Sequence, residues 1–226
     1  MAGSVGNITT DIIKNGLVFN MDAANRASTI PSSATTKTFN TIDTAVSGSF
    51  INGTEYDSST ITPSYVLDGT TDYIDIGTIS SLNANTNFSI SLWCNESVRR
   101  YTGTIFSSGT GTGNLISVSS RNGTISIFVG NSGYKSINLV SLNVWHHVVL
   151  TVDNTTAKVY INNGSPTTET VGSTSSVSGT LAKIGELSFL SGYNFDGNIG
   201  PIHIYNRTLS ASEVLHNYNT LKSRFE

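Results

Sequence analysis

The amino-acid sequence predicts an all-β protein, an antiparallel β-sandwich of the jelly-roll type, with one short helix near its C-terminal end. Three observations support this prediction. Short segments in which apolar and polar side chains alternate run along most of the chain, as expected for half-buried strands. Turns rich in glycine and asparagine separate these segments at short intervals, which favours a sandwich over alternating strands and helices. Only the segment after residue 209 has the spacing of an amphipathic helix.

Composition sets the expected domain organisation. The 226 residues suit one large β domain, which we place at residues 16–209, between a polar arm at 1–15 and a helix and tail at 210–226. Charged residues make up 12% of the chain, and the formal net charge is −3. A nucleic-acid partner normally requires a basic stripe. Because the basic residues are scattered here, no nucleic-acid partner is expected.

Neither a membrane span nor a secretion signal is expected. No apolar run approaches the length that crosses a bilayer, and the first residues lack the basic end and apolar stretch of a signal peptide. We therefore expect a protein that is made in a cytoplasm and has no membrane partner. The single cysteine, Cys94, cannot build a disulfide framework, and we expect it to pack within a strand.

The first part of the domain contains one clear strand followed by a polar region. In "GLVFNMDA", Leu17, Phe19 and Met21 share one face of an alternating strand. Residues 25–63 are rich in serine, threonine and asparagine, yet a structureless loop of that length is uncommon in a compact domain. We therefore expect short edge strands in this region, followed by two strands in "SYVLDGTTDYIDIG".

The middle of the chain predicts further strands and two hairpins. "NFSISLWCN" is an alternating strand with Trp93 on the face opposite its aliphatic residues. We expect Trp93 and Trp145 to fill the core, each with its indole N–H bonded to a backbone carbonyl. Two alternating runs flank Asn122-Gly123, a dipeptide that tolerates positive φ at both turn centres, which predicts a hairpin. A second hairpin is expected from "WHHVVLTVD" and "AKVYINNG". The total is roughly twelve to fourteen short strands.

The segment "GNIGPIHIY" predicts the last strand, and it contains a proline. Pro201 cannot donate a ladder hydrogen bond, so it is tolerated at an edge strand or at a bulge. We expect this strand to close a sheet near the N-terminal strand.

A helix is expected to follow this strand. Ser210 and Glu213 have the spacing of a capping box, and Leu209 and Val214 have that of a hydrophobic staple. Four residues of this helix have helical spacing and form its expected packing stripe, namely Val214, Leu215, Tyr218 and Leu221, and Val214, Tyr218 and Leu221 are the candidates for an assembly contact. This stripe packs either against the sandwich or against a partner in an assembly.

An ordered set of segments resembles a known family. The match covers about residues 16–218, and the segments are "VLDGTTDYIDIG", "FSISLWCN", "WHHVVLTVD", "KVYINNG", "IGEL" and "FDGNIGPIHIYNRTLSASEV". They resemble the concanavalin A-like lectin/glucanase superfamily, in its laminin G-like and pentraxin-like branch of jelly rolls. The opening "GLVFNMDAANRAS" and the closing "IYNRTLSASEVLHNYNTLKSRF" are also similar to virion proteins of tailed bacteriophages.

The resemblance implies a function. We expect a non-enzymatic structural protein of a bacteriophage virion, in a head decoration or in a tail or fibre, with a lectin-like domain that adheres weakly to surface glycans. Other virion proteins and further copies of the chain are the expected partners, and the virion is the expected location. The alternative is a free carbohydrate-binding protein or the binding module of a glycoside-active enzyme.

No catalytic residue is expected. Glucanases of this superfamily carry an E-x-D-x-x-E pattern that places two carboxylates on one strand face, and no glutamate here begins such a pattern. Glu186 is an isolated acid that we expect to be solvated. His146 and His147 are adjacent in a strand, so they point to opposite faces and cannot share one metal ion.

Glycan and metal sites are expected in loops. Tyr101, Tyr134 and Tyr193 fall on predicted loops and are the candidates for stacking on a sugar. Relatives often bind calcium through an acidic pair in the penultimate strand, where this chain has Gly200 and Pro201. No cofactor is therefore expected, with calcium at Asp68 and Asp72 as the alternative. Both aspartates can equally act as turn formers through Asx hydrogen bonds.

Overall fold

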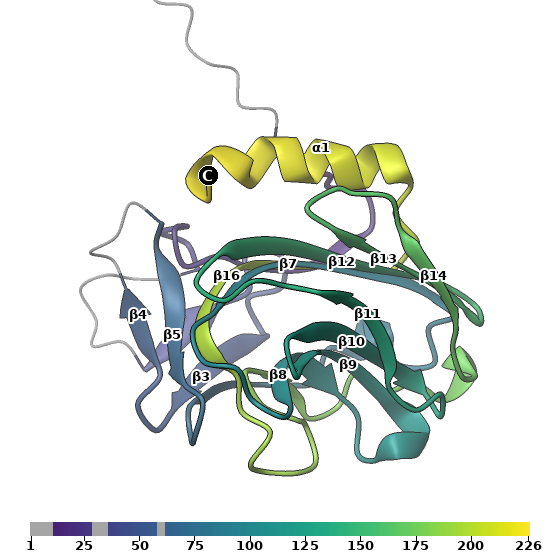
Figure 1. Ribbon diagram of the computed structural model, residues 1–226, viewed down its shortest axis with the longest axis horizontal. Helices are drawn as coiled ribbons and strands as arrows, with labels where there is room; N and C mark the ends of the chain where they lie inside the picture. Colours follow the sequence, from purple (N-terminus) through teal and green to yellow (C-terminus); the bar gives the residue numbers. More distant parts are fainter. Residues whose placement is uncertain (1–10, 29–35, 58–61) are drawn as a thin grey trace, which may run out of the picture.

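The computed structural model describes residues 11–28, 36–57 and 62–226. Within these ranges the chain folds into two stacked antiparallel sheets of eight strands each, with one helix lying across the outside of one sheet (Figure 1). The predicted all-β sandwich with a C-terminal helix is confirmed. No helix of the described ranges is long and apolar enough to cross a membrane.

The first sheet, sheet A, carries the helix on its outer face (Figure 1). Its strand order is β14-β13-β12-β7-β16-β5-β4, and β1 also pairs with β16. The strands of sheet A are β1 (Leu17–Met21), β4 (Glu55–Asp57), β5 (Ser64–Asp68), β7 (Asn87–Glu96), β12 (Trp145–Asp153), β13 (Thr156–Ile161), β14 (Thr167–Thr170) and β16 (Asp196–Tyr205).

The second sheet, sheet B, has the order β11-β10-β9-β8-β15-β6-β3-β2. Its strands are β2 (Lys37–Phe39), β3 (Ser47–Ile51), β6 (Tyr73–Gly77), β8 (Gly103–Ser108), β9 (Leu115–Arg121), β10 (Thr124–Gly130), β11 (Lys135–Leu139) and β15 (Ala182–Ile184). The polar region after residue 25 supplies β2, β3 and β4, as expected, and β2 and β4 are edge strands. Short 3₁₀ turns are η1 (Ser80–Leu82), η2 (Thr112–Asn114), η3 (Thr174–Ser176) and η4 (Lys222–Arg224).

Both predicted hairpins are present. Strands β9 and β10 pair across Asn122-Gly123, where φ is 50° and 79°, as a two-residue hairpin turn of type I′ requires. Strands β12 and β13 pair from Val148 with Ile161 to Asp153 with Thr156. The alternating side chains of all these strands place one apolar set between the two sheets, where it forms the main core.

Strand β16 is central rather than at an edge. Its first half, 196–199, pairs with β5, and its second half, 202–205, pairs with β1, while β7 lies along its other side. The register with β7 shifts between Ile199 and Ile202, so Gly200 and Pro201 form a bulge. Pro201 has no backbone N–H to donate to a neighbouring strand. It lies in the bulge, at the point where the neighbour of β16 changes from β5 to β1, so no ladder hydrogen bond is required of it.

Helix α1 (Ala211–Leu221) begins as predicted. Ser210 and Glu213 form the capping box. Leu209 and Val214 are 3% and 0% exposed and share a small cluster on the outer face of sheet A, consistent with the predicted staple. The helix therefore braces the sandwich, the first of the two alternatives for its apolar stripe.

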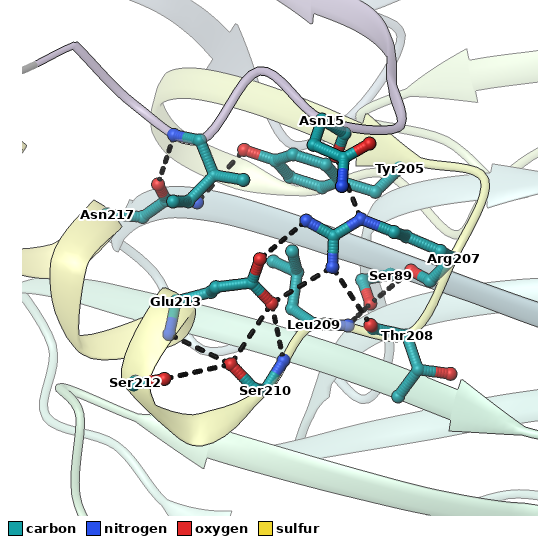
Figure 2. A network of polar contacts seen from close by, with 11 residues as sticks. Asn15, Ser89, Tyr205, Arg207, Thr208, Leu209, Ser210, Ser212, Glu213 and Asn217 are labelled. Atoms are coloured by element: carbon teal, nitrogen blue, oxygen red, sulfur yellow. Dashed lines mark hydrogen bonds and ion pairs between the residues drawn. The ribbon is translucent and has the colours of Figure 1, made fainter.

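Polar contacts fix the start of this helix to the sheet (Figure 2). Arg207 donates to both carboxylate oxygens of Glu213, at 2.6 and 2.9 Å, and from Nε to the carbonyl of Asn15 at 2.9 Å. The ion pair with Arg207 is the main reason why the pKa of Glu213 falls to about 2. Asn217 accepts from the backbone N–H of Ile13 and donates to the hydroxyl of Tyr205, each at 2.9 Å. Residues 11–15 of the predicted arm are thus tied to the helix, and residues 1–10 lie outside the described ranges.

Trp93 departs from its expected position. It is 2% exposed, but it lies on the outer face of sheet A instead of between the sheets. Its ring stacks on Phe225 at 4.2 Å, on His147 at 5.0 Å and on Tyr218 at 5.7 Å between centroids. Among the described residues its indole N–H has no hydrogen-bond acceptor, in contrast to the prediction. Trp145 is only partly buried, with its ring 4.8 Å from that of Phe225.

Gly200 makes room for this aromatic stack. A Cβ atom at Gly200 would lie 3.1 Å from Cζ of Phe225 and 3.1 Å from Cβ of Trp93. The bulge in β16 thus leaves a hollow on sheet A that the Phe225 ring fills. Arg224, the preceding residue, donates two hydrogen bonds to the carboxylate of Asp22, at 2.7 and 2.9 Å. The C-terminal tail is therefore held at two neighbouring points.

Candidate functional site

The outer face of sheet B carries a row of hydroxyls and rings. In β9, Ile116 and Val118 point into the main core, so Ser117 and Ser119 between them point away from it. Their hydroxyls lie 2.8 Å apart. A separate apolar cluster lies on this face and consists of Leu115, Phe128 and Leu187, with Tyr134, Phe189 and Tyr193 packed against it. The alternation of β9 and β10 thus produces a second, smaller apolar surface outside the core.

Three loops bring the predicted tyrosines to this face. Tyr101 precedes β8 and is 70% exposed. Tyr134 lies between β10 and β11, and its ring meets that of Phe128 edge to face, with centroids 5.2 Å apart. Tyr193 lies between β15 and β16, where its carbonyl accepts the backbone N–H of Thr104 at 2.9 Å. The structure therefore gathers these residues around one end of β8 and β9.

Arg121 joins two of these tyrosines and was not singled out from the sequence. It is the last residue of β9, and its Cζ atom lies 4.0 Å from the ring centroid of Tyr134 and 5.4 Å from that of Tyr101. Its Nε donates to Oγ1 of Thr102 at 3.0 Å. We call Tyr101, Arg121, Tyr134 and Tyr193 the tyrosine–arginine site. An arginine on a polar strand face immediately before an Asn-Gly turn is the signal that could have found it.

Electrostatics keep the tyrosine–arginine site positively charged. Burial raises the pKa of Tyr134, and the nearby Arg121 charge and the hydroxyls of Ser117 and Ser119 only partly oppose this. Its phenol is therefore neutral at physiological pH. The site offers ring faces, hydroxyls and one fixed cation. Such a surface can stack on a flat apolar face of a ligand and donate hydrogen bonds beside it.

The two candidate calcium ligands act within turns. The carboxylate of Asp68 accepts the backbone N–H groups of Thr70, Thr71 and Asp72 at 2.8 to 3.0 Å. Burial acts to raise the pKa of Asp68, but these bonds and one from the Thr70 hydroxyl hold it well below its ordinary value. The carboxylate of Asp72 accepts the N–H of Gly53 at 2.8 Å. Both aspartates thus serve as turn formers in this structure.

The surroundings of these aspartates contain a cation of the protein itself. Nη2 of Arg100 lies 2.9 Å from Oδ2 of Asp196 and 3.5 Å from the backbone carbonyl of Asp68. No group of three or more histidine, cysteine or acidic residues that could hold a metal ion is found in the described ranges. The donor set here therefore matches a guanidinium better than calcium, which takes six to eight oxygens.

Other groups considered for chemistry are engaged in the fold. Glu186 is 5% exposed and pairs with Nζ of Lys183 at 2.6 Å, so the expectation that it is solvated was wrong. His147 contacts Oγ of Ser91 through Nε2 at 2.9 Å, and burial lowers its pKa to about 3. His146 contacts Ser141 and belongs to the other side of the strand. Cys94 is buried, and burial raises the pKa of its thiol to about 12.

The three helix residues named as assembly contacts face different surroundings. Val214 is 0% exposed and Leu221 is 9% exposed, both within the chain's own fold. Tyr218 stacks on Trp93, and its hydroxyl donates to the carboxylate of Glu226 at 2.6 Å. Leu215, the fourth residue of the predicted stripe, is 43% exposed instead of packed, and it lies on the part of the helix surface that a partner could reach.

Comparisons with known proteins agree with this fold. A sequence model described as the concanavalin A-like lectin/glucanases superfamily matches residues 68–215. No curated protein matches the sequence significantly.

Solved structures share the fold at low identity. Domain 4 of AbnA, an extracellular arabinanase of family GH43 from Geobacillus stearothermophilus solved with arabinotriose, has a TM-score of 0.67 and 20% identity, over 88% of this chain and 96% of that one. The sialidase of Trypanosoma rangeli, solved with sialic acid, has a TM-score of 0.72 and 14% identity, over 95% of this chain and 34% of that one. A structure of botulinum neurotoxin type C, whose cell entry depends on interaction with two ganglioside molecules, has a TM-score of 0.68 and 13% identity, over 91% of this chain and 51% of that one.

Proposed function

Because this chain belongs to the concanavalin A-like lectin/glucanases superfamily, we propose that it is a non-enzymatic lectin-like protein that binds glycans through the tyrosine–arginine site. The observation that carries the proposal is the convergence of Tyr101, Tyr134 and Tyr193 from three separate loops onto one face. Aromatic rings with polar edges suit sugars, whose ring faces are apolar and whose rims carry hydroxyls. The arabinanase domain, the sialidase and the neurotoxin are similar folds in proteins described with glycan ligands.

A glycan array tests this proposal directly. The protein should bind a subset of immobilised glycans, and Tyr101→Ala should weaken that binding because the exposed ring is the most accessible stacking surface. Leu215→Ala is a matched control, since it removes an exposed apolar side chain from the helix on the opposite sheet. Failure to bind any glycan, or equal binding by the Tyr101→Ala variant, would contradict the proposal.

The non-enzymatic part of the proposal has its own test. The carboxylate of Glu186 is held by Lys183 beside the Ser107 hydroxyl, which donates to the Glu186 carbonyl at 2.8 Å. A retaining glycosidase needs two free carboxyl groups about 5 Å apart across a cleft. We expect no reducing sugar to be released from any glycan that the array identifies. Release that is lost in Glu186→Gln would show that the protein is an enzyme.

We further propose that the protein serves in the virion of a tailed bacteriophage, displayed in several copies. The support is the resemblance of its opening and closing segments to phage virion proteins. These two segments pack together, through the pairing of β1 with β16 and of Asp22 with Arg224. They form a unit on sheet A, opposite the tyrosine–arginine site, so attachment and glycan contact would use different faces. Display in many copies would raise a weak affinity roughly 10²- to 10⁴-fold.

Mass spectrometry of purified phage particles tests the virion role. The protein should be present in particles at a stoichiometry of many copies, and cross-links should start from the helix side of sheet A. Absence from washed particles would contradict this role without affecting glycan binding.

A free carbohydrate-binding protein or an enzyme's binding module is the second candidate, favoured by the match over 96% of the arabinanase domain.

A further inference from the structure

Arg121 has an unusual position for a surface arginine. Its guanidinium lies between the rings of Tyr134 and Tyr101, and its Nε is bonded to Thr102. Three contacts therefore fix one orientation of a side chain that would otherwise move freely. Cation–π contacts and a hydrogen bond of this kind leave less conformational entropy to be lost when a ligand arrives.

The outer edge of this guanidinium has no partner within the protein. In the parts of the chain that the structure describes, neither Nη atom of Arg121 has a hydrogen-bond acceptor, and Arg121 forms no ion pair. By contrast, Arg100, Arg207 and Arg224 each pair with a carboxylate. Arg121 is therefore fixed in place but not neutralised.

A second cation strengthens the positive charge at this turn. The Arg99 guanidinium lies over Gly123, where an added Cβ would approach its Nη1 to 1.9 Å. It donates from Nη2 to the carbonyl of Val140 at 2.8 Å and forms no ion pair within the described ranges. Two arginines thus lie at the Asn122-Gly123 turn without a direct ion pair in the described ranges, although the buried carboxylate of Glu96 interacts with the charge of Arg99.

We propose that the tyrosine–arginine site selects acidic glycans, with Arg121 binding a carboxylate or sulfate group of the sugar while Tyr101 stacks on its ring. This rests on the proposed glycan-binding function and names its ligand class. A guanidinium presents two parallel N–H donors that match a carboxylate or sulfate edge. The neighbouring hydroxyls of Ser117 and Ser119 contact each other and carry no charge, so they do not account for a preference for anions.

Matched pairs of glycans test this selectivity. The pairs are oligogalacturonate and its methyl ester, sialyllactose and lactose, and dextran sulfate and dextran oligosaccharides. The intact protein should prefer the acidic member of at least one pair by about tenfold or more, as a charge-assisted bidentate contact provides. The carboxylated and sulfated pairs then distinguish the two anionic groups. The preference should weaken as salt concentration rises.

Variants assign the preference to Arg121. Arg121→Gln should remove the acidic preference and retain the weaker binding of neutral glycans, and Arg121→Lys should retain part of it, because charge remains but the planar fork is lost. Lys158→Gln, which removes one exposed cation from sheet A, should change nothing. Thermal unfolding of each variant verifies that it is folded.

The outcomes separate this inference from the proposed function. Binding of neutral and acidic members with equal affinity, or an acidic preference that persists in Arg121→Gln, would overturn the inference and leave glycan binding intact. Absence of binding to every member of the three pairs and to the whole glycan array would overturn both.

Discussion

The outer faces of both sheets carry aromatic side chains, but the chain covers those of sheet A and leaves Tyr101 of sheet B exposed. On sheet A, Tyr218 of helix α1 and Phe225 of the C-terminal tail stack on Trp93 and cover it. On sheet B, the exposed Tyr101 and the partly buried Tyr134 flank the guanidinium of Arg121, and no element of the fold stacks on the Tyr101 ring as α1 and the tail do on Trp93. The comparison teaches that aromatic residues on a sheet face have no fixed role. They stabilise the fold where the chain covers them, and they are available to a ligand where it does not.

The largest expected effect lies on the covered face. Trp93→Ala should destabilise the protein by about 3–5 kcal/mol, because a buried ring is lost and the cavity between Phe225 and His147 is only partly refilled. Chemical denaturation followed by far-UV circular dichroism measures the change. A loss below about 1 kcal/mol would show that the aromatic stack on sheet A contributes little.

Acid should also weaken the covered face. Burial lowers the pKa of His147 to about 3 and that of His203 to about 4, whereas both titrate near 6.5 when unfolded. The unfolded chain therefore takes up protons first as pH falls below about 6.5, and stability is lost from there downward. Between pH 6.5 and 5 the two histidines together should cost about 3 kcal/mol.

A substitution of His147 measures its share of the stability that is lost as pH falls. In His147→Gln, about half of that pH-dependent loss should disappear, since one group that titrates is removed. Urea unfolding at pH 7 and pH 5 measures both proteins. Equal losses in the variant and the parent would show that His147 does not remain neutral in the folded state.

A smaller effect is expected at the bulge of β16. Gly200→Val should cost about 1–3 kcal/mol, because its side chain would displace Phe225 from the hollow that it fills. Gly111→Val is the control, since nothing lies within 4 Å of an added Cβ there. Carboxypeptidase should also remove the tail faster in Gly200→Val. Unchanged stability would mean that the Phe225 ring moves aside freely.

On the uncovered face the expected change in stability is near zero. Tyr101→Ala should alter unfolding by less than about 0.5 kcal/mol, as is usual for exposed positions, while it reduces glycan binding. Calorimetry and a binding titration on the same sample give both values. A large loss of stability would place Tyr101 among the structural aromatics instead.

Removal of metal should have the smallest effect of all. Because Asp68 and Asp72 direct their oxygens to backbone N–H groups and Arg100 pairs with Asp196, EDTA should leave both the melting temperature and glycan binding unchanged. Added calcium should not raise the melting temperature. A melting temperature that rises with calcium concentration and then saturates would indicate that Asp68 and Asp72 bind calcium.

Much of this fold could be predicted from local patterns. The Asn122-Gly123 hairpin and the Ser210–Glu213 capping box depend on residues close in sequence, and both are present. The position of Trp93 could not be predicted in the same way. Alternation placed it opposite Leu92, but only the long-range docking of the tail decides which face is covered.

The candidate site was predictable only in part. Loop positions suggested Tyr101, Tyr134 and Tyr193, and the structure gathers them on one face, but their convergence depends on the order of strands β8, β9 and β15, which the sequence does not reveal. Arg121 was missed because its importance comes from two rings distant in sequence. The burial of Glu186 was not predicted because its partner, Lys183, is three residues earlier, and the chain turns between them. Strand alternation does not bring residues at that spacing together.

Nuclear magnetic resonance mapping of a bound glycan tests the contrast between the two faces most directly. With the strongest ligand from the array, amide shifts should be confined to the surroundings of Tyr101, Arg121, Tyr134 and Tyr193 on sheet B. The amides of α1 and of the tail around Phe225 should not move. Shifts concentrated on the helix side of sheet A, with none around Arg121, would contradict the assignment of sheet B as the binding face.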